Sequence, residues 1–98
     1  MGLNYNLIMN LETKLTRSSN CIESKIDGHS VILNLDNDNF IKINRSGRYI
    51  WELLSCDLKI SELLEKITYE HNLSEDNIKK IHLFIKDCID AEILKIIK

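Results

Sequence analysis

The stretch that decides the fold is FIKINRSGRYIWELL, residues 40–54. It begins with a short strand pattern and continues directly into a pattern of apolar residues at helical spacing. Asn44 stands between the two and is a good N-cap, because its side-chain oxygen can accept a backbone N–H of the first helical turn. The stretch therefore predicts a strand over 40–43 that leads into a capped helix, with Trp51 in the core.

Two further strands are predicted upstream, over 21–26 and 31–36. Between them, Asp27-Gly28 suits the positive backbone angles of a tight hairpin turn. Together with the strand over 40–43 they would form a three-stranded antiparallel meander, whose third strand is an edge. The residues expected to face the core from the second strand are Val31, Leu33 and Leu35.

The first residues of the chain have a pattern of their own. From Leu3 to Leu11, apolar and polar side chains alternate almost strictly, which predicts an N-terminal strand. We therefore expect residues 1–13 to be an arm or extra strand ahead of a domain that spans 14–98. The arm could extend a sheet, form a dimer contact, occupy a peptide groove of the same chain, or be a frayed terminus.

Two more helices are predicted downstream, each behind a capping serine. Ser61 precedes one apolar helical pattern and Ser74 precedes another. The last helix should end between Ile89 and Glu92, and residues 93–97 should follow as a short strand or a packed tail. At about 100° per residue, the core face of the last helix comprises Ile78, Ile81, Ile85, Cys88 and Ile89.

The predicted fold class is α+β: a winged-helix-like, three-stranded antiparallel sheet followed by three α-helices, with a possible extra N-terminal strand. A chain of 98 residues with 44% hydrophobic content supports one small domain. Its 13 basic and 15 acidic residues nearly balance, so no global charge draws it to nucleic acid or to an anionic membrane. No apolar run approaches the roughly 20 residues of a membrane span, so we expect no membrane association.

The cysteines and histidines do not indicate a metal or redox site. Cys21, Cys56 and Cys88 are odd in number and include no Cys-x-x-Cys pair, which argues against a disulfide framework and favours a cytoplasmic location. No histidine has a second ligand at a familiar metal-binding spacing. The sequence also lacks a Gly-rich phosphate loop, a nucleophile elbow and an iron–sulfur cysteine cluster. We expect no catalytic residues, no cofactor and no metal.

One order of residues has a counterpart in a known family. A strand followed by Asn-x-x-Gly-x-x-Ile-Trp-x-x-Leu, from Asn44 to Leu54, resembles the PqqD-like family, whose founding member assists pyrroloquinoline quinone biosynthesis. Its domains are also called RiPP recognition elements. The resemblance extends over roughly residues 14–98. It implies a noncatalytic adaptor that binds the leader of a ribosomally synthesised precursor peptide along the third strand, in the cleft against the third helix.

Carried onto this sequence, the resemblance implies a peptide-binding site with two walls. The strand edge would comprise Phe40, Ile41, Lys42 and Ile43. The helical wall would include Lys79, His82, Leu83 and Lys86. Arg45 and Arg48 could extend a basic rim that meets acidic leader side chains.

The partner implied by the resemblance is a separate modifying enzyme, such as a radical S-adenosylmethionine enzyme, a cyclase or a protease. Two other functions fit the same elements. A winged-helix DNA-binding protein is one alternative, although the last helix lacks a basic stripe, so no nucleic acid is expected. A homodimerisation module built on residues 1–13 is the other.

Overall fold

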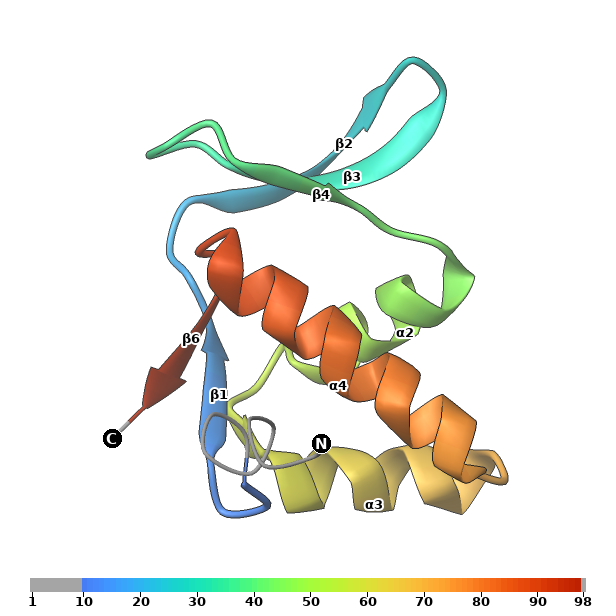
Figure 1. Ribbon diagram of the computed structural model, residues 1–98. Coiled ribbons are helices and arrows are strands. Elements are labelled where there is room, and N and C mark those ends of the chain that lie inside the picture. The colour runs from blue at the N-terminus through green and yellow to red at the C-terminus, as the bar shows by residue number, and fades with distance from the viewer. Residues whose placement is uncertain (1–9, 98) are drawn as a thin grey trace.

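The computed structural model in Figure 1 describes residues 10–97 and combines short strands with three helices. The strand expected over residues 3–11 lies almost entirely outside this range. In chain order the elements are β1 (Lys14–Arg17), β2 (Cys21–Ile26), β3 (His29–Asn34), β4 (Phe40–Lys42), α2 (Arg45–Leu53), β5 (Leu58–Lys59), α3 (Ile60–Glu70), α4 (Glu75–Asp90) and β6 (Leu94–Ile97).

The predicted hairpin is confirmed. β2 and β3 pair antiparallel in a register that joins Ile26 to His29, so the loop has only two residues. Those residues, Asp27 and Gly28, have φ angles of 51° and 82°. Two successive positive φ angles are what a tight hairpin turn of this type requires, which explains the choice of Asp-Gly. β4 then pairs with β3, giving the order β2-β3-β4.

The expected core face of β3 was only partly right. Val31 is 1% exposed, as expected, but Ile32 is fully buried in the core cluster, Leu33 is only half-buried, and Leu35 is 52% exposed beyond the strand. Side chains alternate along a strand, so Asn34 shares the inner face with Ile32. The side-chain amide of Asn34 donates to the carbonyl of Glu92, 2.8 Å away, just beyond α4. A polar residue that ties the sheet to a helix end thus occupies a core-facing position.

A second sheet was not predicted. β1 lies between β5 and β6, and Lys14 faces Lys59 on one side and Ile97 on the other. The partners are far apart in the sequence, and β5 has only two residues. Such short strands carry too little alternation to be recognised. The fold is therefore α+β with two small antiparallel three-stranded sheets and three helices, rather than one sheet.

Two of the three predicted helix caps are confirmed. The side chain of Asn44 accepts the N–H of Gly47 at 2.8 Å, and that of Ser74 accepts the N–H of Asn77 at 3.2 Å. Ser61 is not a cap, because α3 already begins at Ile60.

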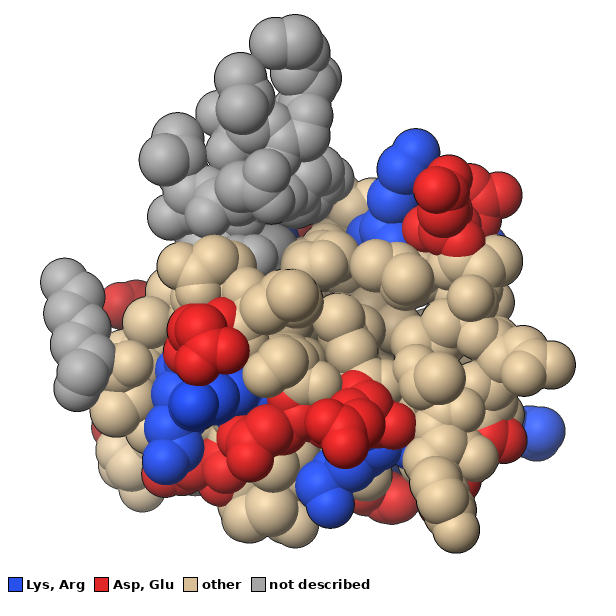
Figure 2. All heavy atoms as spheres, turned by 90° about the horizontal axis from the view of Figure 1, so that it is seen from below, with Lys and Arg blue, Asp and Glu red and all other residues tan. Residues whose placement is uncertain are grey.

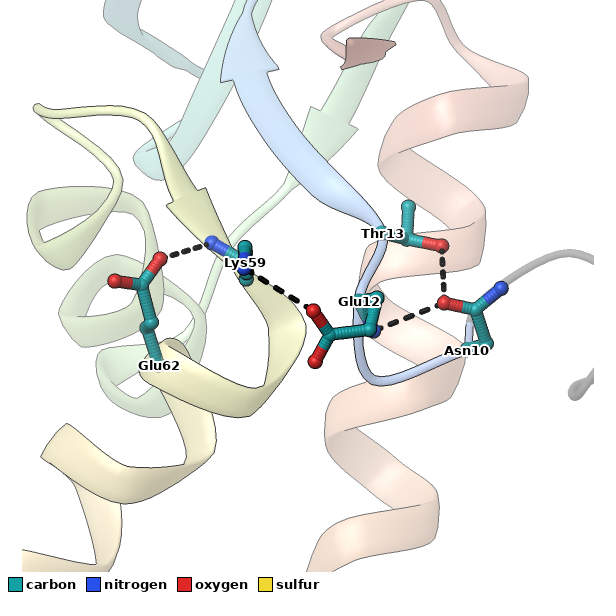
Figure 3. Close-up of polar contacts among 5 residues, drawn as sticks. All are labelled: Asn10, Glu12, Thr13, Lys59 and Glu62. Carbon is teal, nitrogen blue, oxygen red and sulfur yellow. Dashed lines mark hydrogen bonds and ion pairs between the residues drawn. The ribbon is translucent and has the colours of Figure 1, made fainter. Parts of the chain in front are cut away.

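The start of α3 is satisfied by the backbone instead: the N–H of Ile60 donates to the carbonyl of Thr13, and that of Ser61 to the carbonyl of Leu11, each at 2.9 Å. The carboxylate of Glu62 accepts the N–H of Lys59 at 2.8 Å (Figure 3). The ammonium of Lys59 lies 3.1 Å from the carboxylate of Glu12, which links the α3 start to the turn before β1. In that turn, the side-chain oxygen of Asn10 accepts bonds from Glu12 and Thr13. Backbone carbonyls of the turn before β1 thus take the place of the serine cap expected from the sequence, and side-chain contacts hold that turn against α3.

The core lies between the sheets and the helices. Trp51 is 4% exposed, which confirms its predicted place in the core. The guanidinium of Arg17 lies 3.9 Å from the centre of the Trp51 ring and donates to its backbone carbonyl. Burial lowers the pKa of Arg17, and this cation–π contact offsets part of the desolvation. None of the helices within residues 10–97 has the length and apolar character that a membrane crossing demands.

Candidate functional site

The outer edge of β4 is open. Within residues 10–97, β3 is the strand that pairs with β4, and it does so from one side. The N–H of Asn34 donates to Asn39 at 2.8 Å, and the N–H of Ile43 donates to Ser30 at 3.0 Å. These two bonds show that the backbone groups of Asn39, just before β4, and Ile43, just after it, point toward β3.

The backbone groups of β4 alternate in direction. In an antiparallel pair, every second residue directs both its N–H and its C=O toward the partner strand. Because Asn39 and Ile43 face β3, Ile41 does so too, and the register pairs it with Ile32. The N–H and C=O groups of Phe40 and Lys42 therefore point outward. The edge offers two donors and two acceptors to an added strand.

The predicted edge residues divide by side chain as well. Phe40 is 48% exposed, and Lys42 is exposed beside it on the outer face of the sheet. Ile41 packs partly against the core, and Ile43 is buried. Phe40 and Lys42 therefore offer both backbone groups and side chains to a ligand, whereas Ile41 and Ile43 anchor the strand.

β4 runs beside the second half of α4. Just before β4, the side-chain amide of Asn39 donates to the carbonyl of Ala91 at 3.4 Å. Just after it, Gly47 lies against the ring of Phe84, so closely that an added Cβ would be 2.9 Å from a ring carbon. Residues on either side of β4 thus contact the end and the middle of α4. In Figure 1, α4 crosses below the strand. This arrangement forms one wall from a strand edge and another from a helix.

The flank of α4 that faces β4 and α2 is the one that carries Phe84. Ala91 and Lys80 fall on the same flank at about 100° per residue. Leu83 lies about 100° further round, opposite the core face, and is 46% exposed.

The other three residues expected in the helical wall lie elsewhere. Lys79, His82 and Lys86 fall on the opposite flank of α4. Lys86 forms an ion pair with Asp90 at 2.8 Å, and burial lowers the pKa of the half-buried His82. Leu83 lies about 40° from Lys79 and about 100° from Phe84 around the helix, so the helical wall expected from the sequence stays a prediction. The buried Ile81, Ile85 and Cys88 define the core face of α4, and Phe84, beside that face, contacts Gly47.

The basic rim is also divided. Arg48 lies 3.0 Å from Glu23 of β2 and 3.7 Å from Glu52, so its charge is used within the fold. Arg45 instead lines a cavity of about 740 Å³ that opens where β4 ends. Lys80 lines the same cavity from α4.

Phe84 and Lys80 were not named from the sequence. One signal pointed toward Phe84: Gly47 in the first turn of a helix indicates a close approach by a neighbour, and an aromatic ring fills such a space well. Lys80 had no distinguishing signal among the lysines of α4, because its role depends on the rotation of the helix.

No cluster that could hold a metal is present in residues 10–97. The three cysteines are unpaired, and burial raises the pKa of the Cys88 thiol far above its usual value. A thiol held in its neutral form is a poor nucleophile. The features that could bind a ligand beside α4 are the strand edge and the cavity where β4 ends.

The chain matches a known family and a known fold. Residues 29–94 match the family model described as Coenzyme PQQ synthesis protein D (PqqD). The match covers more than half of the chain, and the protein belongs to the PqqD family, as its resemblance predicted.

A solved structure has a similar fold. It is described as TbiB1 in Complex with the TbiA(beta) Leader Peptide, and it matches with a TM-score of 0.64 and 21% sequence identity. The match covers 82% of this chain and 94% of that chain. At this identity the likeness concerns the fold. A comparison with curated protein sequences finds no match.

Proposed function

We propose that this protein is a noncatalytic adaptor that binds the leader of a ribosomally synthesised precursor peptide and presents it to a separate modifying enzyme. The observation that carries the proposal is the open edge of β4, with the backbone groups of Phe40 and Lys42 directed outward beside α4. Membership of the PqqD family supports it, as does the likeness to TbiB1, whose structure is a complex with a leader peptide. Residues 14–98 would form the binding domain, and the adaptor would act in the cytoplasm.

The backbone ladder alone would bind weakly. Four outward groups, at about 0.5–1.5 kcal/mol for each hydrogen bond, contribute about 2–6 kcal/mol. A dissociation constant of 1 μM requires about 8 kcal/mol. Side chains beside the edge must supply the remainder, and the exposed apolar surface for this lies at Phe40, Leu83 and Phe84. We therefore place the peptide over the β4 edge and the Phe84 flank of α4.

Moderate affinity is sufficient for such an adaptor. Holding a leader near an enzyme raises the local concentration of the attached core peptide, so the tether need not bind tightly. The enzyme could be a radical S-adenosylmethionine enzyme, a cyclase or a protease.

DNA binding is less well supported. A DNA reader needs basic side chains along a helix that enters the major groove. The outward side of α4 carries Asp87 and Asp90, and Asp90 pairs with Lys86. Figure 2 views the molecule from below, the side on which α3 lies in Figure 1, and shows acidic and basic side chains next to one another there.

The proposal can be tested by NMR titration of the isotope-labelled protein with a synthetic leader from a small peptide encoded beside this gene. We expect amide shifts at Phe40 and Lys42 and along the Phe84 flank of α4. The N-terminal residues 1–13 should also be deleted in a parallel sample, to test whether they compete for the edge. Absence of shifts in both samples would remove that leader as a ligand.

A further inference from the structure

The cavity at the end of β4 is lined by three segments. Its walls come from the first turn of α2, the connection between α3 and α4, and the first half of α4. The buried side chains of Ile50, Ile67 and Ile81 line it together with the half-buried Phe84. We call it the terminal pocket. Its apolar walls suit the body of an apolar side chain.

The charges at the terminal pocket are of one sign. Arg45 and Lys80 line it, and no carboxylate does, although the chain has 15 acidic residues. Within residues 10–97, neither Arg45 nor Lys80 takes part in an ion pair. The second cavity, between α2 and α3, is different, because Glu62, Glu65 and Glu70 line it together with one cation, Lys66. Of these two cavities, the terminal pocket is therefore the one whose lining charges are net positive.

The terminal pocket continues the open edge of β4. Asn44, which lines it, follows Lys42 by two residues. Phe84 lines the pocket from α4 and contacts Gly47, three residues after Asn44. A peptide paired with β4 advances about 3.3 Å per residue, so its second or third residue beyond Lys42 would reach the pocket.

We propose that the terminal pocket selects leaders in which an acidic residue accompanies an apolar one, just beyond the segment that pairs with β4. The apolar side chain packs on Ile50, Ile81 and Phe84, and the carboxylate lies between Arg45 and Lys80. This inference rests on the proposed function and adds the chemistry of the ligand. Exposed ion pairs contribute little net affinity, so the two cations act chiefly by excluding leaders that carry basic residues there.

The test is a selection from a displayed library of random dodecapeptides against three forms of the full chain. The first is the wild type, and the second is the pocket variant Arg45→Glu/Lys80→Glu. The third is a matched control, Lys25→Glu/Lys95→Glu, which makes the same charge change at exposed residues outside the pocket. Amide spectra and thermal unfolding verify that all three are folded before selection.

We expect the wild type and the control to enrich peptides with Asp or Glu at a constant offset from an apolar residue. The pocket variant should enrich Lys or Arg at that offset, and should bind a selected acidic peptide about tenfold more weakly at physiological salt. If the pocket variant enriches the same acidic peptides as the wild type, the inference is overturned.

NMR spectra of the wild type with the selected peptides test the proposed function separately from the pocket inference. Selected peptides should shift the amides of Phe40 and Lys42 in the wild type. Shifts there without an acidic preference would contradict the pocket inference alone. Selected peptides that leave both amides unchanged would contradict binding at the β4 edge, and the pocket inference with it.

Discussion

The sheet β2-β3-β4 has two open edges, and they differ in what lies beside them. On β2 the same alternation directs the backbone groups of Cys21, Glu23 and Lys25 outward, because Leu35 bonds to Asn20 on the β2 side of β3. This edge is longer than that of β4, at six residues against three. By length alone, β2 would be the better template for an added strand.

The neighbours reverse that ranking. The side chain of Glu23 on β2 is engaged by Arg48 of α2, and Lys25 adds a second charge. Charged side chains on an edge strand oppose pairing with other chains. The β4 edge carries one such charge, Lys42, but it also has the half-exposed Phe40, the Phe84 flank of α4 and the terminal pocket. A free edge permits strand addition, but the surface beside it decides which edge binds a peptide.

The largest effect should come from a proline on the β4 edge, and a proline on the β2 edge serves as its control. Proline removes the outward N–H and adds a ring there, while leaving the bonds to β3 in place. We expect Lys42→Pro to weaken leader binding at least about tenfold, through one lost hydrogen bond and a blocked path. Lys25→Pro, the matched change on β2, should leave the affinity within about twofold. Calorimetric titration measures both, and equal losses would show that the edges are not distinguished.

A smaller effect should separate the two flanks of α4. Phe84→Ala removes apolar surface beside β4, and we expect leader binding to weaken about fivefold. His82→Ala truncates a side chain on the opposite flank and should change stability without changing affinity. Fluorescence anisotropy with a labelled leader measures both variants. If His82→Ala weakens leader binding more than Phe84→Ala does, the peptide contacts the flank of Lys79, His82 and Lys86 that was expected from the sequence.

Gly47→Ala should have a mixed effect. Alanine favours the helix over glycine by about 1 kcal/mol. Its Cβ would lie 2.9 Å from the Phe84 ring, and overpacking costs about 1–3 kcal/mol. We expect a net loss of about 1 kcal/mol in the free energy of unfolding, because the ring must shift, and about a twofold loss of affinity. Urea denaturation provides the check, and a stabilised variant would show that Phe84 moves freely.

The smallest effect should come from Arg48→Ala. The pair with Glu23 is exposed, and such pairs contribute about 0–1 kcal/mol. We expect stability to fall by no more than about 0.5 kcal/mol and leader affinity to stay unchanged. Hydrogen exchange with a leader provides the check. If the leader protects the amides of β2 in this variant, the ion pair alone prevents a peptide from pairing with β2, and the comparison of the two edges must be revised.

Local signals in the sequence predicted the parts of the site that depend on neighbouring residues. Asp27-Gly28 specified a hairpin, and Asn44 and Ser74 specified helix starts, because each acts within a few residues. The edge position of β4 followed from the meander.

The parts that were missed depend on contacts across the chain. The second sheet joins β1 to strands 40 or more residues away, as in the pair Lys14 and Lys59. Asn34 replaces an apolar residue on the inner face because it bonds to Glu92. The flank of α4 that faces β4 was not evident either, because periodicity defines the core face but not which neighbour lies on each side of it.

Amide hydrogen exchange, read residue by residue with and without the leader, tests the central claim most directly. In the free protein, Ile41 and Ile43 should be protected by their bonds to β3, while Phe40 and Lys42 exchange quickly. Addition of the leader should slow exchange at Phe40 and Lys42 and leave Cys21, Glu23 and Lys25 unchanged. Protection that arises on β2, or on neither edge, would contradict the assignment of β4 as the peptide-binding edge.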